Sequence, residues 1–226
     1  MGRLPALGVS GTMAGQTVVP GMREVPRLRT GPSVPAVLVM ALVASNASAQ
    51  AGSIAGVVTT TAKGAAPVRV TFDQKVCGDE LPNESTIVDA EGRLANAVVT
   101  LTGLKRTAAA DIIVLNEKCR FTPRVQVVKP NATVKTTSND AVLHTTQALL
   151  DNGKTIFNFA LPVPGITISK PIGAAGPMRL HCNTHPWMRG WVIVTGEAAA
   201  ISGAGGRFTI DNVPPEIGRA SCRERV

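Results

Sequence analysis

The chain has 226 residues, a formal net charge of +8 and a pI near 9.9, a balance that first suggests nucleic-acid binding. Residues 1–49 hold four arginines and one glutamate, and residues 217–226 hold three arginines and one glutamate, so residues 50–216 carry only +3. Because the chain also has only five Phe and two Trp to stack on bases, we expect no nucleic-acid partner.

An export signal is predicted near the N-terminus. Arginines at 23, 27 and 29 precede an apolar run over residues 34–44, and an A-x-A cleavage motif ends at Ala49. The apolar run is too short to span a membrane, which needs about 20 residues. We therefore expect residues 1–49 to be a signal-peptide region whose true start is Met22. The mature protein is expected to be periplasmic or secreted, with no membrane span.

From Gly52 onward the pattern is that of an all-β protein. Short runs rich in Val, Ile and Thr alternate with Gly, Pro, Asn and Asp, and such spacing suggests a sandwich or a barrel. Residues 50–105 are interpreted as an N-terminal β segment and residues 106–196 as a compact unit with every candidate ligand. The expected strands cover residues 53–59, 68–72, 97–101, 112–115, 126–128, 133–138, 155–159, 165–169, 178–182 and 191–195.

Two short segments follow this unit. Residues 197–215 are interpreted as the start of a truncated second β domain, since the run from Gly205 to Pro215 resembles the opening of a carboxypeptidase-regulatory-like domain over a dozen residues. Residues 216–226 resemble the translation of a sequencing adapter, and the alternative is a basic disordered tail. We expect an artefact there, and no function for Cys222.

The remaining cysteines are Cys77, Cys119 and Cys182, an odd number for an oxidising compartment. The natural partition is a disulfide between Cys77 and Cys119, which leaves Cys182 as a free thiolate. The sequence does not fix this connectivity, and a bond to Cys182 would remove it as a ligand.

The segment from Cys182 to Met188 brings a thiolate, the His185 imidazole and a thioether together within seven residues. His144 supplies a second imidazole about forty residues upstream. One thiolate and two imidazoles with a weak axial Met form the ligand set of a blue-copper centre. Zinc is the competing metal, but a structural zinc site normally has a second Cys or His in place of the Met.

The distant His followed by C-x2-H-x2-M, with Pro186 directly after the second His, is similar to the cupredoxin family, closest to its amicyanin- and plastocyanin-like members. The resemblance covers roughly residues 106–196. It implies a Greek-key β-sandwich of cupredoxin type, to which the N-terminal β segment is an addition. It also implies one type 1 copper ion, held by His144, Cys182, His185 and Met188.

The resemblance further suggests that the Thr145 N–H donates a hydrogen bond to the Cys182 sulfur and tunes the reduction potential. Asn139 and Thr145 are expected to brace the ligand loop. Pro186 and Trp187 lie beside His185, the more exposed ligand in this interpretation, and we expect them to form an apolar docking patch for a redox partner.

These features predict an extracytoplasmic carrier of single electrons that is not itself an enzyme. The alternative is a copper-binding, copper-handling or sensing protein that uses the same ligands. A copper enzyme with a further histidine-rich cluster is excluded because the chain has only three His.

Overall fold

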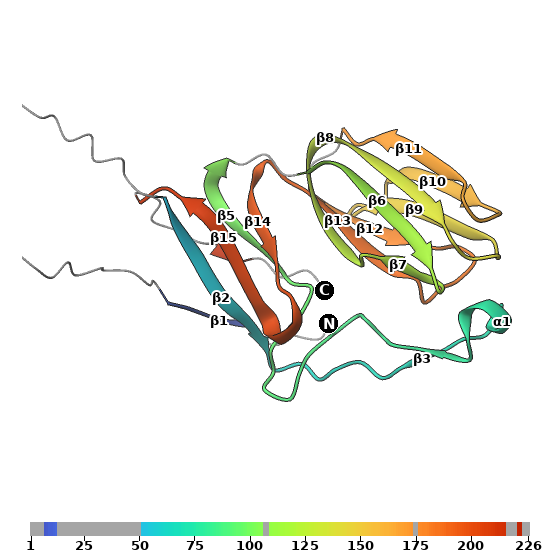
Figure 1. The fold of residues 1–226 in the computed structure, drawn as a ribbon, viewed down its shortest axis with the longest axis horizontal. Helices are drawn as coiled ribbons and strands as arrows, with labels where there is room; N and C mark the ends of the chain where they lie inside the picture. Colours follow the sequence, from blue (N-terminus) through green and yellow to red (C-terminus); the bar gives the residue numbers. More distant parts are fainter. Residues whose placement is uncertain (1–6, 13–50, 106–108, 174–175, 216–220, 223–226) are drawn as a thin grey trace, which may run out of the picture.

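The computed structural model describes residues 7–12, 51–105, 109–173, 176–215 and 221–222, and their regular secondary structure is almost entirely β-strand (Figure 1). The predicted signal peptide lies outside the described residues, apart from Leu7–Thr12. The strands that surround the ligands are β6 (Ala109–Glu117), β7 (Arg120–Thr122), β8 (Val125–Ser138), β9 (His144–Leu150), β10 (Thr155–Leu161), β11 (Thr167–Pro171), β12 (Gly176–His181) and β13 (Arg189–Val194).

Strand β8 belongs to both layers of this unit. Its first half pairs in parallel with β13, from Trp191 opposite Val125 onward, in the order β10-β9-β12-β13-β8. Its second half pairs with β6 and β11, beginning at Thr133. Between the halves Asn131 has φ 64°, a left-handed conformation that Asn tolerates better than most residues. The predicted β-sandwich of cupredoxin type is confirmed, although the two strands expected at 126–128 and 133–138 are one.

The two layers enclose an apolar core because inward and outward side chains alternate along the strands. In β8 the residues from Ala132 to Ser138 alternate between buried and half-buried positions. Val134 packs with Phe157, Leu180 and Val192 in one cluster that also contains Cys182 and Met188. The candidate ligands are thus held by the core and not by a surface loop alone.

A second unit combines both ends of the described chain. It contains the sheets β1-β2-β15 and β14-β5-β16. Their strands are β1 (Leu7–Thr12), β2 (Gly52–Thr60), β5 (Val98–Lys105), β14 (Glu197–Ile201), β15 (Arg207–Val213) and β16 (Ser221–Cys222). β14 pairs with β5 and β15 pairs with β2, and Phe208 and Ile210 pack against Val58 and Leu101.

The structure therefore differs from the expected boundary at residue 197. Strands β14 and β15 do not begin a unit of their own, because their apolar faces complete the core that β2 and β5 begin. Strands β1 and β16 lie in the segments that we interpret as preceding the true start and as adapter-derived, and that interpretation stays a prediction.

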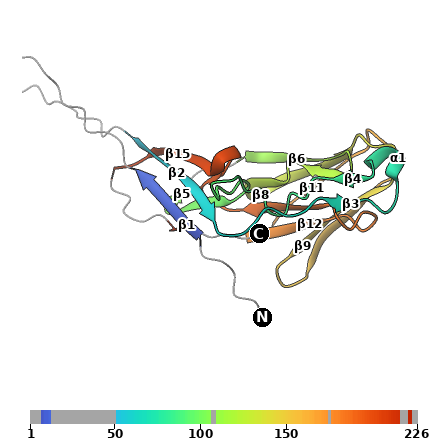
Figure 2. The same cartoon turned by 90° about the horizontal axis from the view of Figure 1, so that it is seen from below.

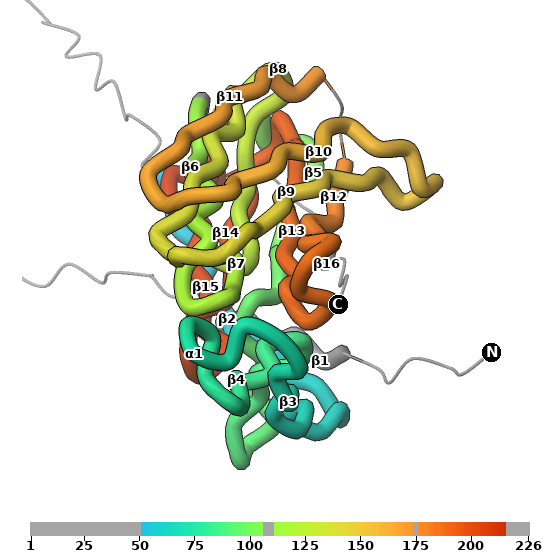
Figure 3. Tube along the Cα trace, turned by 90° about the vertical axis from the view of Figure 1, so that its right-hand side faces the viewer, coloured from blue at the N-terminus to red at the C-terminus, as the bar shows by residue number. Residues whose placement is uncertain are grey.

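Between β2 and β5 the chain leaves this unit and runs along the sandwich to its far end (Figures 1 and 2). This part contains β3 (Val68–Arg69), the four-residue helix α1 (Gln74–Cys77) and β4 (Glu80–Leu81), which pairs with β3. We call residues 68–82 the cover segment. Val70 and Leu81 join the sandwich core, and Cys77 forms a disulfide with Cys119, directly before β7. Figure 3 shows α1 beside β7 at this end of the molecule.

Among the described residues, no helix has the length and apolar character that a membrane crossing requires.

The disulfide is expected to stabilise the fold strongly because it closes a loop with a sequence separation of 42. Replacing both cysteines, Cys77→Ala with Cys119→Ala, should lower the free energy of unfolding by about 3–4 kcal/mol on the chain-entropy model. Urea titration of the metal-free protein, followed by tryptophan fluorescence, measures the change. Cys222→Ser serves as the control, and an unchanged urea midpoint in the double variant would contradict the prediction.

Candidate metal centre

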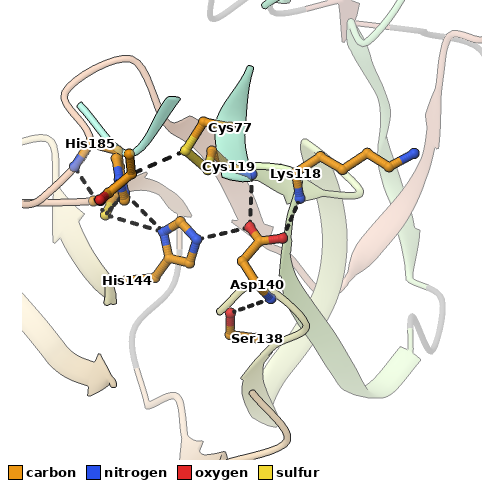
Figure 4. The surroundings of a disulfide bond; sticks show 9 residues. Cys77, Lys118, Cys119, Ser138, Asp140, His144 and His185 are labelled. Carbon is orange, nitrogen blue, oxygen red and sulfur yellow. Dashed lines mark hydrogen bonds and ion pairs between the residues drawn. A yellow bond between two sulfur atoms is a disulfide. The ribbon is translucent and has the colours of Figure 1, made fainter. Parts of the chain in front are cut away.

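Three donor atoms converge at the end of the sandwich that the cover segment reaches (Figure 4). The Cys182 Sγ lies 4.0 Å from His144 Nδ1 and 3.8 Å from His185 Nδ1, and the two Nδ1 atoms are 3.0 Å apart. All three side chains are fully buried. Cys182 is a free thiol, whereas Cys77 and Cys119 are bonded to each other.

Strand pairing explains why distant residues meet here. His144 is the first residue of β9, and Cys182 directly follows β12, which pairs with β9. The loop after Cys182 is closed by backbone hydrogen bonds, since the Met188 N–H donates to the His185 carbonyl at 2.9 Å and the Cys182 N–H donates to the Met188 carbonyl at 3.4 Å. Met188 is buried and lies directly before β13. The structure thus places three of the four predicted ligands in one loop and His144 at the adjacent strand end, and all four side chains are buried.

Each candidate imidazole is bonded to a carboxylate through its other nitrogen. His144 Nε2 lies 2.9 Å from Asp140 Oδ2, and His185 Nε2 lies 3.0 Å from Asp73 Oδ2. An Nε2–H that donates to a carboxylate leaves the Nδ1 lone pair free, and it fixes the orientation of the ring. Both Nδ1 atoms face the thiol, so the donor set is oriented for a metal ion.

Asp140 is itself held by the chain around it. Its two carboxylate oxygens accept hydrogen bonds at 2.8 Å from the N–H groups of Lys118 and Cys119, and its own N–H donates to the Ser138 hydroxyl at 3.2 Å (Figure 4). The turn that carries Cys119 therefore orients the carboxylate that orients His144.

Hydrogen bonds also hold the sulfur atom. The N–H groups of Thr145 and His185 each donate to Cys182 Sγ at 3.4 Å, and the Thr145 hydroxyl lies 3.7 Å from it. The Thr145 hydroxyl accepts a hydrogen bond from the Asn183 N–H at 2.6 Å, which ties β9 to the ligand loop. Asn139 bonds to the end of β6, where its side chain donates to Glu117 at 2.9 Å. Its contact is thus with β6, and Thr145 is the residue that reaches the loop.

These contacts favour the charged thiolate. Burial raises the pKa of the Cys182 thiol, but hydrogen bonds with His144 and His185 and with the two backbone N–H groups outweigh it and bring the pKa from 9.0 to about 5. Burial lowers the pKa of His185, while Cys182 and Asp73 raise it, and the net direction is upward. A thiolate at neutral pH is the form that binds metal.

The expectation that His185 is the more exposed ligand is wrong. Its exposed fraction is 0 %, as is that of His144. Asp73 bonds to its Nε2, and Cys77 Sγ lies 4.0 Å from the same atom. Pro186 is exposed, whereas Trp187 is half-buried and stacks on Phe72 of the cover segment, with ring centroids 5.9 Å apart.

Two other groups of metal-ligating side chains lie nearby. One contains Cys77, Cys119 and His185, and the other contains Cys119, Asp140 and His144. Both include sulfur atoms that the disulfide already uses, so the group of His144, Cys182 and His185 is the one with free donors.

Neither carboxylate was predicted from the sequence. Asp140 lies four residues before His144, a spacing that could have marked it as a partner of that ring. Asp73 gives no such signal because 112 residues separate it from His185.

No protein-family model matches the chain, and no curated protein matches it. Among solved structures, a purple cupredoxin from Nitrosopumilus maritimus is 28% identical with a TM-score of 0.33, and the match covers 38% of this chain and 100% of that one. A mutant of amicyanin in its Cu(I) form is 22% identical with a TM-score of 0.33, over 44% of this chain and 100% of that one.

A copper-containing nitrite reductase from Thermus scotoductus is 19% identical with a TM-score of 0.32, over 42% of this chain and 24% of that one. The predicted resemblance of residues 205–215 to a carboxypeptidase-regulatory-like domain receives no support from these comparisons.

The depressed pKa of Cys182 predicts a thiolate in the metal-free protein above about pH 5, which is lost as the pH falls through that value. Ultraviolet thiolate absorption of the Cys222→Ser variant, in which Cys182 is the one cysteine outside the disulfide, measures the titration. The folded protein should titrate near pH 5, and the same protein in urea near pH 9.0. A folded-state midpoint close to that of the unfolded chain would contradict the hydrogen-bond argument.

Removing the charge that faces His185 should weaken metal binding. Asp73→Asn keeps an oxygen acceptor but loses the carboxylate, and changes to such partners of a ligand typically cost about 10–100-fold in metal affinity. Competition with a copper chelator measures the effect. Asp79→Asn is the matched control because Asp79 is an exposed residue of the same segment. Equal copper affinity in the two variants would show that Asp73 does not support the ligand.

Proposed function

We propose that His144, Cys182 and His185 hold one copper ion, with Met188 as the weak axial ligand, and that the protein carries single electrons between redox partners. The observation that carries this proposal is the convergence of one free thiol and two Nδ1 atoms within 4.0 Å of one another in a fully buried group. A thiolate suits Cu(I) and imidazole suits Cu(II), so the donor set fits both oxidation states.

When bound, the metal supplies a one-electron couple between Cu(I) and Cu(II). The chain supplies the rigidity that such a couple needs. Asp140 and Asp73 hold the two rings, and the N–H groups of Thr145 and His185 hold the sulfur. Since all three donors are buried, water is excluded from the site and the ligands keep their positions.

We further propose that the protein catalyses no reaction of its own and acts in the periplasm or outside the cell. The predicted export signal supports this location, and so does the Cys77–Cys119 disulfide, because disulfides persist in oxidising compartments.

Copper(II) added to the full chain should produce an intense blue thiolate-to-copper absorption band. Cys182→Ser should abolish the band because it removes the one thiolate that faces the two imidazoles. Cys222→Ser makes the same chemical change outside the site and should leave the band intact. Visible absorption spectra measure all three proteins.

Cyclic voltammetry then distinguishes an electron carrier from a protein that handles or senses copper. A reversible one-electron couple is expected, and loss of metal in one oxidation state would favour copper handling or sensing. A colourless protein that binds zinc as readily as copper would contradict the electron-carrier function altogether.

A further inference from the structure

If the proposed function holds, the cover segment limits where a partner can exchange electrons. The Asp73 carboxylate is hydrogen-bonded to His185 Nε2, and the Phe72 ring stacks on Trp187. The disulfide fastens this segment to the sandwich. A partner therefore has no access to the imidazole edge of His185 while the cover is in place.

Next to the cover a pocket opens between the cover segment and the ligand loop. Its lining joins Leu81 and Glu84 on one side to Arg120, Trp187 and Arg189 on the other. Met188 and Phe121 form its buried wall. Since Met188 is a predicted ligand, this pocket connects the protein surface with the candidate metal centre.

The rim of this pocket is strongly basic. Arg120, Arg124 and Arg189 line the pocket, and Arg179 lies outside the lining on β12. We call these four arginines the basic patch. Arg124 donates to the Arg189 carbonyl at 2.9 Å. Arg179 of β12 lies opposite Trp191 of β13, which is two residues from Arg189, so the two exposed arginines share one face of these paired strands. Arg120 pairs with Glu84 at 3.1 Å, whereas the other three form no salt bridge with any residue that the structure describes.

Two of the residues that line the pocket also carry a buried N–H group without an acceptor. Arg120 Nε and Trp187 Nε1 are both buried, and neither has a hydrogen-bond partner among the described residues. Buried donors of this kind are costly unless they are satisfied. These two donors are too deeply buried for an occupant of the pocket to reach. The guanidinium groups of Arg124, Arg179 and Arg189, which form no salt bridge with a described residue, favour an occupant that brings negative charge.

We propose that the basic patch is the docking surface for a redox partner that presents a cluster of carboxylates, and that electrons cross beside Trp187 and Met188. That electrons are exchanged rests on the proposed function. That the partner is acidic rests on charge complementarity with the basic patch. In each encounter one electron leaves the reduced carrier and reduces the partner by one electron, and no covalent bond forms or breaks.

Binding is tested first without metal. A hexaglutamate peptide is titrated into the metal-free protein, and tryptophan fluorescence and isothermal titration calorimetry report binding. Arg179→Gln with Arg189→Gln should weaken binding about tenfold or more at low salt, since both side chains are exposed and lose only their charge. Arg207→Gln on β15 is the matched control and should bind as the wild type does.

Hexalysine should not bind the wild type. Failure of hexaglutamate to bind the wild type, or equal binding by the double variant, would overturn the docking surface. Equal loss in the Arg207→Gln control would do the same, because it would indicate a general charge effect. A nucleotide oligomer that binds more tightly than hexaglutamate would also overturn it in favour of a phosphate-bearing partner.

Electron exchange is tested second, with the copper-loaded reduced protein. Stopped-flow rates are compared for hexacyanoferrate(III), an anion, and tris(phenanthroline)cobalt(III), a cation. The double variant should react about tenfold more slowly with the anion and no more slowly with the cation. Wild-type protein that reacts with neither reagent would overturn the proposed function. Wild-type protein that reacts with both, at rates the arginines do not alter, would overturn the docking surface alone.

Discussion

The Cys77–Cys119 disulfide connects the two carboxylates that orient the candidate ligands. The backbone N–H of Cys119 holds Asp140, which bonds to His144. Cys77 ends the helix that Asp73 begins, and Asp73 bonds to His185. Both rings also contact Cys182 Sγ. The chain of contacts from one ring to the other is therefore closed at one side by Cys182 and at the other by the disulfide. Displacement of any member would disturb both imidazoles, and for this reason the cover segment is part of the centre and not an appendage.

Much of this arrangement follows from local patterns in the sequence. The loop from Cys182 to Met188 was predicted because its ligands are close along the chain, and strands with alternating apolar residues were found at nearly the expected positions. Strand β9 was missed, since polar residues such as Thr146 and Gln147 hide its alternation. Thr146 is buried because its hydroxyl bonds to Thr136 at 2.8 Å, a cross-strand contact that no local pattern reveals.

The errors concern contacts between segments that lie far apart in the sequence. Strands β14 and β15 were assigned to a new domain because their partners, β5 and β2, lie about a hundred residues or more earlier. Asp73 was overlooked, and His185 was expected to be the more exposed ligand, for one shared reason: the cover segment reaches His185 through a contact that spans 112 residues. Local spacing identifies ligands, whereas the surroundings of a ligand depend on tertiary contacts.

A covered ligand and a basic rim are compatible with a carrier of electrons. Under the proposed function, the contact between Asp73 and His185 would keep water from the donors and hold the ring in both oxidation states, but it would close the imidazole edge of His185 to a partner. Exchange then depends on how closely and in what orientation a partner docks. A carboxylate cluster opposite Arg124, Arg179 and Arg189 would steer the encounter at long range and fix its orientation at contact. In this proposal the charges around the pocket, and not the apolar surface at Pro186, select the partner.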